Sequence, residues 1–392
     1  MVHSCAGFLV ANRLGPLAVG VAALLLVLAW QVIVVHFGYG DNWSGLFHIG
    51  DRWPLPPALA GDGARVSPND PGYDGVFYHL AAHDPWLTRG FWRFADNPSL
   101  RWRRILLPGL AWIAALGDDA RIHAAYVGIN LLFVFLGAWW LARFSASKKG
   151  SISFGLGFLA VPSVLVSMDR LTVDTALAAL TIGLFVYAAD EQVWKQSAIL
   201  ALCPLARETG LCLSAGTALQ ALRTRRWKQF LWTALSALPF LFWAGFVSRN
   251  TTNDATPWLS LPFAGIIRRT LTPVVYPITG RGIALAAGLD YLALLGVWAA
   301  IILAAYLALK RKSGLIEYCI YGFAFAAVWL SKADIWTGAY EFGRTLSPLM
   351  ILLGLISVRE RIWWFLLPLV CTLPRIFLQL LVQLRLAILS HG

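Results

Sequence analysis

Apolar segments of about 20 residues, the length that crosses the hydrocarbon core of a bilayer as a helix, recur along the whole chain. Residues 16–37, 124–144 and 285–309 are clear examples. Of the 392 residues, 58% are hydrophobic and only 13% are charged, whereas soluble domains carry about 25% charged residues. The sequence therefore predicts an all-α, polytopic transmembrane helical bundle and not a soluble enzyme with an anchor.

Positive charge is concentrated in short segments between the apolar stretches. The formal net charge is +12, and cations cluster at Lys148-Lys149 and in residues 223–228, 310–312 and 359–361. Because cytoplasmic loops carry excess Lys and Arg, we expect these clusters on the cytoplasmic side. No nucleic-acid motif accompanies the charge, so nucleic acid is not expected as a partner.

Placing these clusters on one side gives about eleven spans, at roughly 20 apolar residues each. Residues 1–392 are then one integral-membrane domain. Residues 105–117 are too short to cross and are expected to lie as a helix at the outer membrane surface. The apolar stretch 197–222 is interrupted at Arg207 and Glu208, and we expect two short arms with these two residues at their outer tip.

One segment does not fit this topology. Residues 248–282, which the order of spans places outside, contain Arg249, Arg268, Arg269 and Arg281. Either the segment is cytoplasmic and the order of spans is different, or these arginines have an anionic partner on the outer side.

A long polar segment, residues 38–121, follows the first apolar stretch and is expected to be extracytoplasmic. It is rich in Pro, Gly, Asp and Trp and is longer than a plain connection requires. Two short surface helices are expected in it. One follows Asp74, and the other begins at Asp84-Pro85, where an Asp cap precedes a Pro in the first turn.

The unusual ionisable residues collect on the outer side of this topology. They are Asp51, Asp74, Asp84, Arg103, Arg104, Asp169, Arg170, Asp174, Arg207, Glu208, Arg268, Arg269, Lys332, Glu341 and Arg344. Ionisable groups at membrane depth usually mark a substrate path or an internal pair. Arginines bind phosphate by charge-assisted hydrogen bonds, and a carboxylate can take a proton from an attacking hydroxyl. The set suits transfer from a lipid-phosphate donor.

The order of segments resembles the GT-C class of polyprenyl-phosphate-sugar-dependent glycosyltransferases, in which a first span, a long outer loop with an acidic motif and many further spans follow one another. Residues 72–78 (GYDGVFY), Asp84-Pro85 and residues 101–108 (RWRRILLP) more narrowly resemble bacterial membrane proteins linked to cell-surface glycopolymer formation. Residues 206–210 (ARETG) and the turn that ends in Asp174 also look like that group.

The resemblance implies an inverting glycosyltransferase of the bacterial inner (cytoplasmic) membrane with its active face outside. It would move a sugar from a polyprenyl-phosphate donor to a cell-envelope glycan or lipid acceptor. Asp74 is the expected catalytic base. The expected substrate-binding residues are Tyr73, Tyr78, Asp84, Arg103, Arg104, Asp169, Asp174, Arg207, Glu208 and Arg344, with Arg268 and Arg269 as further phosphate ligands. Many GT-C enzymes carry adjacent acidic residues where Asp74 stands alone, so Asp51 and Asp84 are rival bases.

Each of these residues also has a purely structural interpretation. Asp74, Asp84 and Asp174 are placed to cap helices, and Arg103 and Arg104 could anchor a surface helix to lipid headgroups. His79 and His83 lie four apart on one helical face and, with Asp84, could bind a divalent metal, although the HExxH pattern is absent. No metal ligand and no cofactor is therefore assigned.

Two other functions remain open at this point. A transporter or flippase of a lipid-linked sugar predicts paired inverted repeats and broken helices at the midplane, and the sequence shows no such symmetry. A non-catalytic subunit of an envelope polysaccharide system would tolerate loss of Asp74.

Overall fold

The computed structural model describes residues 2–60, 63–252, 260–274 and 281–389. Within them the chain is almost entirely helical. The helices are α1 (Val2–Ile33), α2 (Pro57–Ala60), α3 (Gly75–His83), α4 (Pro98–Arg103), α5 (Leu106–Ala114), α6 (Asp119–Ser147), α7 (Pro162–Arg170), α8 (Asp174–Ala189), α9 (Val193–Ala206), α10 (Leu211–Arg223), α11 (Trp227–Ser236), α12 (Leu238–Asn250), α13 (Ala264–Leu271), α14 (Arg281–Leu309), α15 (Leu315–Trp329), α16 (Ala339–Glu360) and α17 (Leu367–Leu389).

Shorter elements connect these helices. A π-helical turn, η1 (Val34–Gly38), ends α1. Six 3-10 helices are η2 (Trp43–Phe47), η3 (Phe91–Phe94), η4 (Ile152–Ala160), η5 (Glu208–Gly210), η6 (Ala333–Trp336) and η7 (Trp363–Leu366). Strands β1 (Ile49–Gly50) and β2 (Val66–Ser67) pair in parallel, with Ile49 opposite Val66.

Six described helical segments are long and apolar enough to cross a membrane. They are Leu14–Gly38, Asp119–Ser147, Trp227–Asn250, Gly282–Leu309, Ala339–Glu360 and Trp363–Arg385. The bent pair Ile152–Ala160 and Pro162–Arg170 makes a seventh if it is one span. Asp174–Ala189, Val193–Ala206 and Leu315–Trp329 are shorter apolar helices. The structure is thus a membrane-type helical bundle, as predicted, whereas the count of eleven spans stays a prediction.

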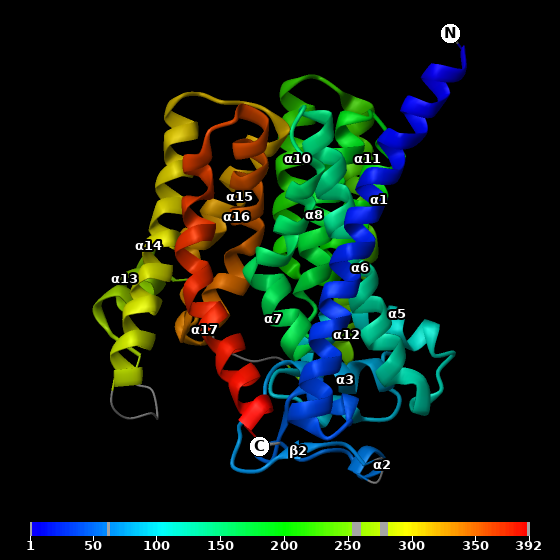
Figure 1. Cartoon of the computed structure of the whole chain (residues 1–392), viewed down its shortest axis with the longest axis vertical. Helices are drawn as coiled ribbons and strands as arrows, with labels where there is room; N and C mark the ends of the chain where they lie inside the picture. The colour runs from blue at the N-terminus through cyan, green and yellow to red at the C-terminus, as the bar shows by residue number, and fades with distance from the viewer. Residues whose placement is uncertain (1, 61–62, 253–259, 275–280, 390–392) are drawn as a thin grey trace.

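The polar segment after α1 forms a layer across one end of the bundle. Figure 1 shows α2, β2, α3 and α5 at that end, with α17 ending beside them and α1 beginning at the opposite end. Helix α16 passes through the middle of the bundle, and 83% of the residues in its most apolar stretch are buried. It begins on the side of the loop layer, so its first turns can supply side chains to a site there.

The cationic clusters gather at the other end of the bundle. Arg361 donates a hydrogen bond to the carbonyl of Lys149 at 3.4 Å, and Arg223 donates one to the Tyr318 hydroxyl at 2.7 Å. Arg359 pairs with Glu317, which lies in the first turn of α15 directly after the 310–312 cluster. The sequence analysis expected these clusters on one side of the bundle from their charge alone.

The two-arm prediction for residues 197–222 agrees with the chain path. Helix α9 ends at Ala206, Arg207 is extended, and α10 begins at Leu211. Gln196 near the start of α9 and Gln220 near the end of α10 line one cavity, so the arms run antiparallel. Arg207 lies at the tip.

The expected helix at Asp84-Pro85 is absent, and that prediction is wrong. The Asp84 carboxylate accepts backbone N–H bonds from Thr88 at 2.8 Å, from Arg89 at 3.1 Å and from Phe91 at 3.2 Å. These bonds fold the segment into a turn, because a donor bound to a side chain cannot also continue a helix. The expected helix after Asp74 is present as α3.

Two arginines of residues 248–282, Arg268 and Arg269, have partners inside the protein. Arg269 pairs with the buried Asp290 of α14 at 3.3 Å, and Arg268 donates to the Ser331 carbonyl. Of the two explanations that the sequence left open, an anionic partner on the same side accounts for Arg269. Part of this segment lies outside the described residues.

Candidate active site at the loop end of the bundle

Asp74 is placed by a close backbone contact at the start of α3. Gly75, the first residue of that helix, packs so tightly that a Cβ would lie 2.3 Å from the Arg170 carbonyl oxygen and 2.7 Å from that of Phe47. Only glycine fits such an approach. The Asp74 side chain makes no capping hydrogen bond, so the N-cap interpretation is not supported. Its carboxylate turns towards the bundle instead.

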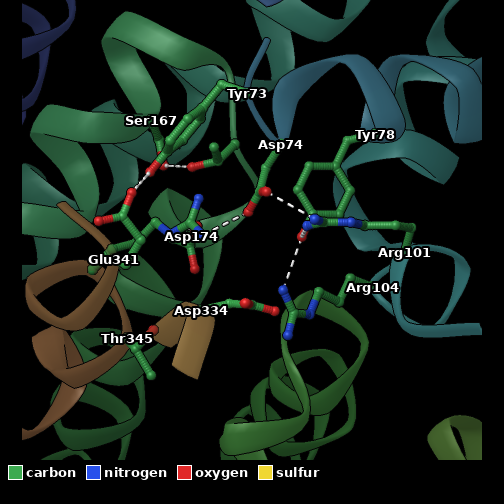
Figure 2. Close-up of polar contacts among 12 residues, drawn as sticks. Tyr73, Asp74, Tyr78, Arg101, Arg104, Ser167, Asp174, Asp334, Glu341 and Thr345 are labelled. Carbon is green, nitrogen blue, oxygen red and sulfur yellow. Dashed lines mark hydrogen bonds and ion pairs between the residues drawn. The ribbon is translucent and has the colours of Figure 1, made fainter. Parts of the chain in front are cut away.

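Two arginines from distant parts of the chain hold the Asp74 carboxylate (Figure 2). Arg101 of α4 donates to Oδ1 at 2.8 Å, and Arg344 of α16 donates to Oδ2 at 2.6 Å. The side chains of Arg101 and Arg344 are 7% and 8% exposed. Burial by itself raises the pKa of Asp74, but the charges and hydrogen bonds of the two arginines outweigh it and hold that pKa well below its usual range. Asp74 is therefore ionised.

Helix α4 decides which arginines of the RWRR motif face this carboxylate. Asn97 caps α4 by accepting from the Leu100 N–H, and Pro98 follows in the first turn. Arg101 and Arg104 lie three apart and share a face. Arg104 donates to the Tyr78 hydroxyl at 2.9 Å and pairs with Glu208 at 3.0 Å.

Arg103 points elsewhere and donates to the Ser99 carbonyl at 3.0 Å. Arg101, to which the sequence analysis gave no role, lies beside Asp74 and also pairs with Asp96 at 2.6 Å. The structure therefore does not bring Arg103 into the site.

The break between α9 and α10 brings a fourth arginine, Arg207, to the same cavity. The extended backbone of Arg207, with φ −163°, lets its guanidinium pair with Asp174 at the start of α8. It also donates to the Thr345 hydroxyl at 2.8 Å. Arg344 lies 3.5 Å from the other oxygen of Asp174, so Asp174 links the arginines of two helices.

These residues line a cavity of about 270 Å³ between the loop layer and the bundle. Its lining comprises Tyr73, Asp74, Asp96, Asn97, Leu100, Arg101, Arg104, Arg207, Lys332, Asp334, Ile335, Thr337, Glu341, Arg344 and Thr345. Five cations and four carboxylates are therefore part of its lining. Such a lining can bind an anion by exchanging its internal ion pairs for pairs with the ligand.

A second cavity of about 320 Å³ shares Tyr73, Thr337 and Glu341 with the first. Tyr73 donates a long hydrogen bond to Glu341 at 3.5 Å, and these two side chains stand between the cavities. The second cavity is also lined by His48, Arg170 and Arg375. The pair of cavities offers room for two substrates on either side of Tyr73 and Glu341.

A cavity of about 560 Å³ lies at the opposite end of the bundle among Glu191, Arg226 and Lys228. These three side chains are exposed, with Lys228 in the first turn of α11, and the cavity contains none of the buried ion pairs described above. We therefore place the candidate site in the smaller cavity at the loop end, where charged groups are both buried and convergent.

The remaining expected residues divide into two groups. Tyr78, Asp174 and Glu208 contact the arginines of the cavity without lining it. Asp84 and Asp169 lie apart from it: Asp84 holds its own turn, and Asp169 pairs with Arg170 and accepts from Gln383, both at 3.1 Å. The rival base Asp51 accepts the Asn69 N–H at 2.7 Å in an exposed turn.

Sequence reasoning gave no role to Arg101, Asp96, Asp334 or Glu341, and the structure places all four on the cavity wall. The spacing of Arg101 and Arg104 was the available signal, but using it requires knowing that α4 is helical through both positions. Glu341 and Lys332 were recognised only as outer-side ionisable residues.

A metal-ligand geometry occurs outside this cavity, at His79, His83 and His123. No described group of three or more metal-ligating side chains lies within the cavity itself. The possible metal site with Asp84 is not supported by the structure, because the Asp84 oxygens accept hydrogen bonds from backbone N–H groups.

Comparisons with protein families, with curated proteins and with solved structures find no match to this chain.

Proposed function

We propose that this protein is an integral-membrane glycosyltransferase that takes a sugar from a polyprenyl-phosphate donor. The observation that supports this most is the Asp74 carboxylate held between Arg101 and Arg344 in a polar cavity at the end of an apolar bundle. A lipid-linked phosphate needs both parts, an apolar surface for its chain and convergent arginines for its headgroup.

The distribution of charge supports an extracytoplasmic active face. The cationic clusters gather at one end of the bundle and the cavity lies at the other. Because cytoplasmic loops carry excess Lys and Arg, the cavity faces away from the cytoplasm. Helix α1 begins and α17 ends at opposite ends of the bundle (Figure 1). An odd number of spans has this result, so the arrangement is consistent with about eleven spans, at roughly 20 residues each, in one GT-C-like domain of the bacterial cytoplasmic membrane.

In the proposed reaction the donor phosphate binds to Arg101, Arg104, Arg207 and Arg344. Its charge competes with Asp74 for Arg101 and Arg344. As these arginines turn to the phosphate, Asp74 loses the charges that keep its pKa low and becomes a better base. The arginines then stabilise the charge that grows on the leaving phosphate in the transition state.

The proposed glycosyl transfer needs only the donor, the acceptor and Asp74. The acceptor hydroxyl oxygen attacks the anomeric carbon, and Asp74 takes the hydroxyl proton. The bond from the anomeric carbon to the phosphate oxygen breaks, and polyprenyl phosphate leaves with the electron pair. Attack opposite the leaving group inverts the anomeric carbon. The second cavity, across Tyr73 and Glu341, is the proposed place for the glycan or lipid acceptor.

Transfer assays on membranes containing the full chain, with a panel of polyprenyl-phosphate sugars, test this proposal. Asp74→Asn is expected to lower the transfer rate about a hundredfold or more, since it removes the proton acceptor. Arg101→Ala should cause a comparable loss, whereas Arg103→Ala, on the other face of the same helix, should stay near the wild-type rate. Asp51→Asn is the control for the general loss of a loop carboxylate.

Full transfer by an Asp74→Asn protein that is present at the wild-type level would exclude Asp74 as the base. Equal losses in the Arg101 and Arg103 variants would show that α4 acts through its fold and not through a phosphate contact. Absence of transfer with every donor, together with movement of a lipid-linked sugar across vesicles, would favour a flippase.

A further inference from the structure

Three histidines meet where α3 packs on α6, outside the cavity proposed for catalysis. His79 and His83 are one turn apart on α3, and His123 is in the second turn of α6. One ligand nitrogen from each lies within 4.8 Å of the others. The Nε2 atoms of His79 and His83 are 2.9 Å apart. His79 and His83 are only 2% and 3% exposed.

The orientation of His83 is set by a carboxylate behind it. Its Nδ1 lies 2.6 Å from Asp119 Oδ1, so Nδ1 carries the proton and donates to the carboxylate. Arg89 holds Asp119 in turn, with both Nη atoms at 2.8 Å from its two oxygens. The Nε2 lone pair of His83 is thereby directed at His79. A carboxylate that orients a histidine in this way is the usual outer partner of a metal ligand.

The surroundings of His79 are dry and leave one of its nitrogens unsatisfied. Its Nδ1 is buried and has no hydrogen-bond partner among the described residues. Phe47 stacks on the ring at a centroid distance of 4.3 Å, and Tyr126 packs edge-on against Phe47 at 5.2 Å. His123 also stacks on the His79 ring, at a centroid distance of 4.6 Å, and lies 5.6 Å from Phe47. A buried imidazole nitrogen without a hydrogen-bond partner, such as His79 Nδ1, costs free energy unless it binds something.

We propose that His79, His83 and His123 bind a zinc ion, with Asp119 as the carboxylate that orients His83. Zinc binds imidazole nitrogen at about 2.0–2.1 Å, so tetrahedral ligand nitrogens lie about 3.4 Å apart. The observed nitrogen separations are close to this value. The Nε2 atoms of His79 and His83 are 2.9 Å apart, and no pair of ligand nitrogens is more than 4.8 Å apart. Binding requires the His123 ring, which stacks on His79 at an interplanar angle of 17°, to turn so that all three nitrogen lone pairs face one centre.

The role of this metal is to fasten the loop layer to the bundle. Asp74 directly precedes α3, the helix that carries Tyr78 as well as His79 and His83. A metal that joins α3 to α6 therefore limits movement of the Asp74 carboxylate relative to the arginines. The site is distinct from the cavity and its existence does not depend on the glycosyl-transfer proposal.

Metal analysis of the full chain tests the proposal. The protein is purified in detergent with a tag that contains no histidine, equilibrated with Zn²⁺ and dialysed, and its zinc is measured by inductively coupled plasma mass spectrometry. The wild type should hold about one zinc per chain, the number that three ligands at one centre provide. His83→Gln should lower zinc affinity at least tenfold, and Asp119→Asn by about ten- to a hundredfold. His36→Gln, which changes an exposed histidine paired with Asp41, should keep the metal.

A wild-type protein that retains no zinc, or a His83→Gln variant with unchanged zinc affinity, would overturn the proposal. If the variants do not fold, X-ray absorption at the zinc edge of the wild type decides it. Imidazole scattering from a nitrogen shell near 2.0–2.1 Å supports the site. A sulfur shell, or oxygen neighbours alone, would contradict it.

Discussion

At the scale of single residues, the neighbouring sequence marked Asp74 as a candidate site residue. It did not predict that Arg101 and Arg344 bind the Asp74 carboxylate. The GYDG context marks Asp74 as the first acidic residue before a short helix. Arg344 lies 270 positions away, and no local pattern relates the two. Arg104 and Arg207 were expected and line the cavity. Arg101 was missed because its side-chain direction depends on where α4 begins.

His48 is a second residue whose chemistry is set by tertiary contacts. Its Nδ1 accepts from Arg170, and its Nε2 lies 3.2 Å from Asp70. Burial, and then the charge of Arg170, lower the pKa of His48 from 6.5 to about 4, while Asp70 opposes this shift. The folded protein therefore keeps this imidazole neutral in weak acid.

We expect a pH dependence of stability from this residue. Because the folded-state pKa is below the unfolded value, the unfolded chain takes up a proton that the folded protein does not. The contribution of His48 is complete above about pH 6.5 and declines as pH falls towards 4, reaching a loss of about 2 kcal/mol at pH 5. Thermal unfolding in detergent from pH 7.5 to 4.5 should show a shallower acid decline for His48→Gln than for wild type.

The exposed His36→Gln serves as the control, and its acid decline should match the wild type. Identical profiles for His48→Gln and wild type would mean that the His48 imidazole is already protonated in the folded state.

At the scale of elements, the short helices of the loop layer are positioned by close contacts more than by propensity. Residues 75–83 form a helix as expected, and the segment after Asp84 does not. A sequence pattern of Asp then Pro is common to helix starts and turns. The outcome depends on whether the backbone N–H groups bind the Asp84 carboxylate, and here three residues do.

Gly75→Ala should displace α3 and Asp74 with it. The added Cβ would meet two carbonyl oxygens closer than 3 Å, and such overpacking costs about 1–3 kcal/mol. We expect a lower melting temperature and a transfer rate reduced more than stability alone explains. Gly128→Ala is the matched control, because a Cβ at Gly128, in the interior of α6, meets nothing within 4 Å. An unchanged melting temperature for Gly75→Ala would contradict the close packing.

At the scale of the whole molecule, polarity separates the two ends of the bundle. Asp51 is exposed in the loop layer, and Lys149 is exposed at the cationic end. If the bundle crosses the membrane in the proposed orientation, these positions are on opposite sides.

Cysteine labelling measures that orientation. In a background without Cys5, Cys203, Cys212, Cys319 and Cys371, single cysteines replace Asp51 or Lys149. A membrane-impermeant thiol reagent added to intact cells should label the Asp51→Cys protein, and should label Lys149→Cys only after the membrane is opened. The reverse pattern would place the cavity in the cytoplasm, where an extracytoplasmic lipid-linked donor could not reach it.

The sequence by itself determined the membrane class, the helical architecture, the long polar loop and the cationic end, because span length and charge bias are local properties of a segment. Tertiary structure decided which side chains meet. The position of Arg101 beside Asp74, the turn held by Asp84, and the position of His123 beside His79 and His83 all follow from helix register and packing. Those contacts join residues far apart in the chain, and a pattern read along the sequence does not contain their directions.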